Sequence, residues 1–141
     1  MKNKAYVITV PCGGKSTFVR DNNGHYNIMR IYDVDSLAPI NSYQPLYDLP
    51  DNSCILGGSH KPNMQEFIYA VVLPSDITLI RNVLLRIIES PTNGWPSMVL
   101  SNPQIGYYTA CKTAEEYNIP IFKTFEEALD YIVDLINKQS D

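Results

Sequence analysis

The sequence predicts a single α/β domain in which a mostly parallel sheet of about five strands is covered by helices in three layers. Short apolar runs alternate along the chain with segments of helical periodicity. The length of 141 residues is a usual size for one domain, and no linker or internal repeat divides it. These observations favour a sheet with crossover helices over an all-α or all-β domain.

Five apolar runs are the expected strands. Each is nearly unbroken, which is typical of strands covered on both faces of a parallel sheet. The runs are Ala5–Val10, Met29–Val34, Cys54–Leu56, Phe67–Leu73 and Ile119–Phe122.

Three helices are expected from their start signals. Ser75 can cap a helix whose apolar face is formed by residues at steps of three and four, namely Ile77, Ile80, Leu84, Ile87 and Ile88. Pro103 suits the first position of a helix that ends near Tyr117. Thr124 and Glu127 match the capping box, and the final helix has a buried stripe of Ala128, Leu129, Ile132, Val133 and Ile136.

The composition argues against several classes of protein. The formal net charge of −4 disfavours a surface that neutralises nucleic-acid phosphates without sequence preference. Three separated cysteines without clustered histidines predict neither a disulfide framework nor a zinc site. No apolar stretch approaches the roughly 20 residues of a membrane span, so we expect a soluble, cytoplasmic protein without a membrane partner.

The run AYVITVPCGGKST joins the first expected strand to a helix start. A glycine-containing loop at such a junction directs backbone N–H groups at an anion. We therefore expect a nucleotide phosphate to be bound by Pro11, Cys12, Gly13, Gly14, Lys15, Ser16 and Thr17. Lys15 would reach the β- and γ-phosphates, and the Ser16 hydroxyl would bind Mg²⁺. The alternative is a turn that contains G-G-K-S by chance, because the G-x-x-x-x-G-K-[ST] pattern has glycine where this chain has Thr9.

The chain resembles the small P-loop kinases of the polynucleotide kinase and zeta-toxin type, which are common in phage and viral genomes. Three stretches carry the resemblance: VPCGGKSTFVR, the segment YDVDSL at 32–37, and the strand, proline and helix from Ile68 to Arg86. The resemblance implies a three-layer P-loop NTPase fold. It also implies transfer of a phosphoryl group from ATP, with Mg²⁺, to a nucleoside, a nucleotide or a nucleic-acid end.

Carried over to this chain, the resemblance makes Asp35 the base for the attacking hydroxyl or a ligand of Mg²⁺, with Asp33 beside it at the acceptor. The alternative for this pair is a solvated strand end. Arg81 and Arg86 are candidates for stabilising the transferring phosphoryl group. Five residues separate them, which places their side chains roughly 140° apart on a helix, so at most one of them faces the phosphates.

Other candidate contacts lie in loops. His60, in the turn after the third expected strand, is a candidate contact to the acceptor, although a surface histidine in a turn commonly has no such role. Trp95 and four tyrosines could stack on a base or simply pack; the tyrosines are Tyr43, Tyr47, Tyr107 and Tyr108. The proline-containing segments 38–52 and 90–103 are expected to be long loops, and 90–103 is the expected mobile lid.

Two functions remain open at this point. The first is an ATP-dependent phosphotransferase in which Lys15, Asp35 and Arg86 act on the phosphoryl group. The second is a degenerate P-loop module that binds nucleotide, or has lost it, and serves as a structural or regulatory partner. The oligomeric state and the identity of the acceptor are not indicated by the sequence.

Overall fold

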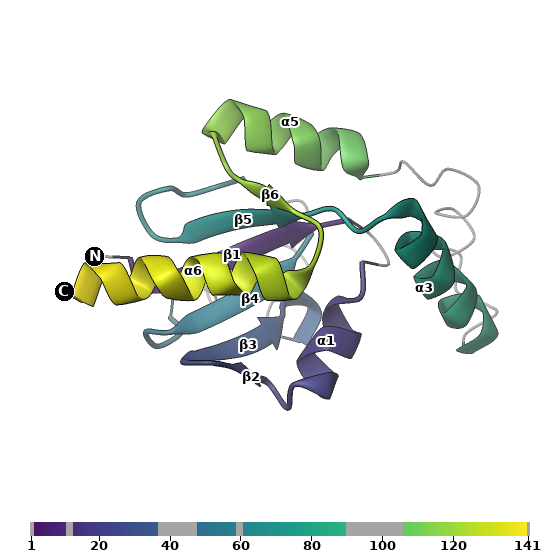
Figure 1. The fold of residues 1–141 in the computed structure, drawn as a ribbon, viewed down its shortest axis with the longest axis horizontal. Coiled ribbons are helices and arrows are strands. Elements are labelled where there is room, and N and C mark those ends of the chain that lie inside the picture. The colour runs from purple at the N-terminus through teal and green to yellow at the C-terminus, as the bar shows by residue number, and fades with distance from the viewer. Residues whose placement is uncertain (1, 11–12, 37–47, 59–60, 90–105, 141) are drawn as a thin grey trace.

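A computed structural model describes residues 2–10, 13–36, 48–58, 61–89 and 106–140. Within these residues the fold is α/β, with one mixed sheet of strand order β2-β3-β4-β1-β5-β6 (Figure 1). The strands are β1 (Lys4–Thr9), β2 (His25–Tyr26), β3 (Met29–Asp33), β4 (Ser53–Gly57), β5 (Ile68–Val72) and β6 (Ile121–Phe122). The helices are α1 (Lys15–Asp21), the 3₁₀ helix η1 (Val34–Ser36), α3 (Asp76–Glu89), α5 (Tyr107–Tyr117) and α6 (Phe125–Ser140).

The sheet has six strands in the described part of the chain, so the expected count of five was too low. The strand that sequence reasoning missed is β2, which pairs antiparallel with β3. Its two residues are too few to show a period in the sequence. The turn into β3 contains Asn27 at a φ of 54°, a left-handed conformation that asparagine tolerates better than most residues. All other pairings in the sheet are parallel, as expected.

Helices cover both faces of the sheet. On one face α1 and α6 pack on a cluster that includes Val7, Leu56 and Ala70. On the opposite face α5 packs Ala110 and Ala114 against Tyr6 and neighbouring strand residues. Figure 1 shows α6 in front of the sheet and roughly along the direction of its strands, with α5 beside the β5–β6 edge. This arrangement is compatible with the expected three layers.

The capping signals of two helices are confirmed. The Thr78 amide donates to Ser75 Oγ (3.2 Å), and the Glu127 amide donates to Thr124 Oγ1 (3.2 Å). The Thr124 hydroxyl in turn donates to the Glu127 carboxylate (3.3 Å). The expected stripe of α6 is also buried, comprising Ala128, Leu129, Ile132, Val133 and Ile136.

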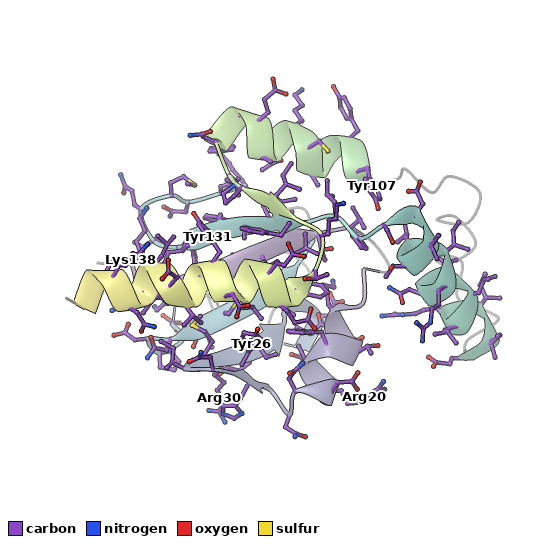
Figure 2. All side chains as sticks on the ribbon, viewed as in Figure 1. Arg20, Tyr26, Arg30, Tyr107, Tyr131 and Lys138 are labelled. Atoms are coloured by element: carbon purple, nitrogen blue, oxygen red, sulfur yellow. The ribbon has the colours of Figure 1, made fainter. Side chains whose placement is uncertain are left out.

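The expected helix start at Pro103 lies outside the described residues; Gly106 has a left-handed φ of 87°, and α5 begins at Tyr107. Its end at Tyr117 is confirmed. Tyr107 lies at the end of α5 that is nearer to α3 (Figure 2), and its hydroxyl donates to the carbonyl of Pro74 just before α3. Burial raises the pKa of the Tyr107 phenol, with a smaller effect from the charge of Asp76. This contact connects the starts of the two helices.

Helix α3 lies beyond the end of the sheet toward which β1 and β3 point (Figure 1). The residues that the sequence groups on its apolar face are largely exposed, with exposed fractions of 82% for Ile77 and 75% for Ile88. The residues that are fully buried are Leu79 and Val83, which contact Val10 at the end of β1, and of the expected face Ile87 packs against them while partly buried. Because α3 lies at the end of the sheet, it can make only this narrow contact. The periodicity of its apolar residues therefore did not identify its buried face. Within the described residues, none of the helices is both long enough and apolar enough to cross a membrane.

A pH-dependent contact joins β2 to α6. The Tyr26 hydroxyl donates to the carboxylate of Asp130 (2.8 Å), and Tyr26 lies between these elements in Figure 2. Burial, together with the hydrogen bond and charge of Asp130, raises the pKa of Tyr26 to about 12. The unfolded chain ionises this phenol near its ordinary value of 10.0, while the native protein still holds the proton.

We therefore expect the free energy of unfolding to contain a contribution from Tyr26 that is complete below pH 10 and is lost as the pH rises from about 10 to about 12. Urea unfolding at several pH values, for the parent and for Tyr26→Phe, measures it. The difference between the two proteins should shrink over this range. Tyr108→Phe, which changes an exposed ring, is the control and should keep the parental profile. A constant difference from pH 9 to 12 would contradict the prediction.

Candidate functional site

The candidate site is built where β1 ends and α1 begins. The Gly13 amide donates to the Val10 carbonyl (3.0 Å), which closes a tight turn after the strand. Gly14 precedes α1 with a φ of 94°, a conformation that side chains disfavour. Phe18 of α1 stacks on Phe125 of α6, with 5.1 Å between ring centroids. The start of α1 is therefore held against the body of the domain.

Thr9 stands where the G-x-x-x-x-G-K-[ST] pattern has its first glycine, and it lies beneath Gly13. Its side chain is buried, and its hydroxyl donates to the Val72 carbonyl of β5 (2.9 Å). A Cβ atom added to Gly13 would lie 2.6 Å from Thr9 Oγ1 and 2.9 Å from the Val10 carbonyl oxygen. Gly13 thus lies directly over the threonine, and a side chain at position 13 would clash with it.

Lys15 faces two carboxylates at the end of β3. Its Nζ atom lies 4.0 Å from Asp33 Oδ1 and 3.7 Å from Asp35 Oδ2. The side chains of Lys15 and Asp33 are largely enclosed, with exposed fractions of 17% and 14%, whereas that of Asp35 is 82% exposed. The structure therefore brings together all three of these candidate residues.

The family resemblance made Asp35 the principal carboxylate, but the side chain of Asp33 is the more enclosed of the two. Asp33 is the last residue of β3, and Asp35 lies in η1 rather than on the strand. Asp33 Oδ1 accepts the Asp35 amide (3.1 Å), and the Ser36 hydroxyl donates to the Asp33 carbonyl (2.7 Å). Asp33 therefore shapes the turn that places Asp35, in addition to facing Lys15.

Ser16 and Arg86 are also in contact. A terminal guanidinium nitrogen of Arg86, from the last turn of α3, donates to Ser16 Oγ (3.2 Å). Thr17 follows in α1 with an exposed side chain. Arg81 is exposed on α3. Of the two arginines that the sequence singled out, Arg86 is the one with a contact to a loop residue.

Several expected contacts lie outside the described residues. These are Pro11, Cys12, His60, Trp95, Tyr43, Tyr47, the expected lid at 90–103 and most of the loop at 38–52. The remaining aromatic candidates are Tyr107, which contacts Pro74, and Tyr108, whose ring lies 5.9 Å from the ammonium of Lys112. Neither has a contact to the loop in the structure as described.

Compared with models of known protein families and with curated proteins, the chain matches none.

The side chains beside the loop offer oxygen atoms, which are the type of ligand that Mg²⁺ prefers. The described residues contain no group of three or more His, Cys, Asp or Glu side chains arranged to hold a metal. Mg²⁺ in phosphate sites, however, commonly takes only one or two carboxylates and completes its shell with phosphate oxygens and water. The oxygen donors are Ser16 Oγ, which accepts from Arg86, and the carboxylate of Asp35, which faces Lys15. Ser16, or Asp35 where it does not act as the base, would hold the ion together with a bound phosphate.

Proposed function

We propose that this protein is an ATP-dependent phosphotransferase that acts on a nucleoside, a nucleotide or a nucleic-acid end. One observation carries the proposal. Two cationic side chains, Lys15 and Arg86, and the carboxylates Asp33 and Asp35 converge from α1, α3 and the end of β3 on a glycine turn that follows a buried strand. The carboxyl ends of strands in open α/β sheets are where ligands commonly bind.

Each side chain has a role in this proposal. Lys15 leaves the carboxylates to contact the β- and γ-phosphates, and Arg86 reaches the phosphoryl group from beside Ser16. Asp35 accepts the proton of the attacking hydroxyl. Its side chain is exposed to solvent, so an acceptor molecule can reach it. Mg²⁺, when bound with ATP, neutralises charge that develops on the phosphates.

A second candidate function is nucleotide binding without transfer, in a structural or regulatory protein. The exposure of Asp35, at 82%, favours this alternative, because a solvated carboxylate gains little from the enclosed surroundings that strengthen electrostatic interactions. Incubation of the protein with Mg²⁺ and γ-labelled ATP distinguishes the two functions. The acceptors are a nucleoside, a nucleoside monophosphate and an oligonucleotide with a 5′-hydroxyl. Label on one acceptor supports the transferase, and binding of ATP without transfer supports the alternative.

Replacement of Lys15 with alanine should weaken ATP binding at least tenfold, or about 1.4 kcal/mol, because it removes the enclosed ammonium beside the turn. Isothermal titration calorimetry with ATP and Mg²⁺ measures this change. Lys138→Ala is the control, since Lys138 is an exposed residue of α6 that pairs with Asp134. Equal affinity of the Lys15 variant and the parent would contradict the phosphate-loop interpretation.

A further inference from the structure

The face that α3 turns toward the loop carries a polar residue that the sequence did not single out. Side chains on a helix are offset by about 100° per residue, which places Leu79, Asn82, Val83 and Arg86 within one arc of roughly 100°. Leu79 and Val83 are buried against Val10, and Arg86 reaches Ser16. Asn82 therefore lies on the side of α3 that packs against the end of β1 and the loop.

The distance to Gly14 places Asn82 at the loop itself. A Cβ atom added to Gly14 would lie 3.4 Å from Asn82 Nδ2, which is direct contact. Gly14 has no side chain, so the amide of Asn82 faces the backbone of the residue just before Lys15. Asn82 and Arg86 are one turn apart, and they reach residues on either side of Lys15, namely Gly14 and Ser16.

We propose that Asn82 is a phosphate-binding residue, whose side-chain amide donates a hydrogen bond to a non-bridging oxygen of a polyphosphate bound beside Gly14, where α3 meets the start of α1. The inference rests on the proposed nucleotide site and adds α3 as its second wall. Asn82 supplies a neutral donor and Arg86 a charged one, while Lys15 approaches from the side of Asp33. The ligand class is a nucleoside polyphosphate that is recognised through its phosphate chain.

Two substitutions at position 82 separate contact with phosphate from a purely structural role. Asn82→Ala removes the donor, and loss of a hydrogen bond to a charged group should weaken binding about tenfold or more. Asn82→Asp keeps the shape but replaces the donor with a negative charge, so repulsion should weaken binding about tenfold further. Leu84→Asp is the matched control. It adds the same charge to α3, about 200° away from Asn82 around the helix axis, at a residue that is 46% exposed.

The probes are Mg²⁺-ATP and inorganic tripolyphosphate, titrated by calorimetry into each variant after circular dichroism has compared its thermal unfolding with that of the parent. The inference expects the order parent, Asn82→Ala, Asn82→Asp of decreasing affinity for both probes, with Leu84→Asp within twofold of the parent. Equal losses in the alanine and aspartate variants, or an aspartate variant no weaker than Leu84→Asp, would overturn it while leaving the proposed nucleotide site intact. A parent protein that binds neither probe would overturn both.

Discussion

Replacement of Gly57 with alanine is expected to lower the free energy of unfolding by about 3 kcal/mol. Gly57 ends β4, and the ring of Tyr6 from the neighbouring strand β1 lies over it. A Cβ atom at position 57 would overlap the Tyr6 hydroxyl and lie 2.6 Å from Cζ of the ring. Tyr6 is only 1% exposed and is packed among buried residues, so its ring has no free space to move into.

The next residue supplies a close control. A Cβ atom added to Gly58 would meet nothing within 4 Å, so Gly58→Ala should change the free energy of unfolding by less than about 0.5 kcal/mol. Urea unfolding measures both variants. Tyr6→Leu combined with Gly57→Ala completes a double-mutant cycle. If the ring is the obstacle, the double variant should be scarcely less stable than Tyr6→Leu alone. Similar unfolding midpoints for the alanine variants at 57 and 58 would contradict the prediction.

Replacement of Asp35 with asparagine is expected to slow phosphoryl transfer at least about 100-fold, because the amide cannot accept the proton of the attacking hydroxyl. ATP affinity should stay within a few-fold of the parent or rise in the absence of Mg²⁺. The reason is that the variant loses a negative charge that lies 3.7 Å from Lys15 Nζ. Single-turnover transfer from labelled ATP, together with calorimetry, measures the two effects separately.

Two further variants test this assignment. Asp51 lies in the turn just before β4, which runs parallel to β1, so it is at the end of the sheet away from the loop. Asp51→Asn should therefore leave transfer unchanged. Asp33→Asn keeps an oxygen that can accept the Asp35 amide, so the turn of η1 should persist. Parental transfer by Asp35→Asn, with loss of transfer in Asp33→Asn, would assign the base to the more enclosed Asp33 instead.

The candidate site was predictable only in part. Lys15 and Ser16 follow from local pattern, because a glycine loop after a buried strand is visible in the sequence, whereas Asp33 and Asp35 were expected from the family resemblance. The sequence did not predict that Asp33 is enclosed and Asp35 exposed, since this difference depends on where η1 turns away from the sheet. Asn82 gave no signal of its own. Its spacing of four residues from Arg86 becomes informative only once Arg86 is known to face the loop.

The sequence by itself determined the features that arise from contacts between near neighbours. The positions of the five longer apolar runs, the caps at Ser75 and Thr124 and the buried stripe of α6 depend on residues a few positions apart. Only the tertiary structure decided the order of the strands, the pairing of β2 and the buried face of α3. These depend on which surfaces meet, and α3 meets the domain at the end of the sheet, where burial of Leu79 and Val83 leaves Ile77 and Ile88 exposed and turns Arg86 toward the loop.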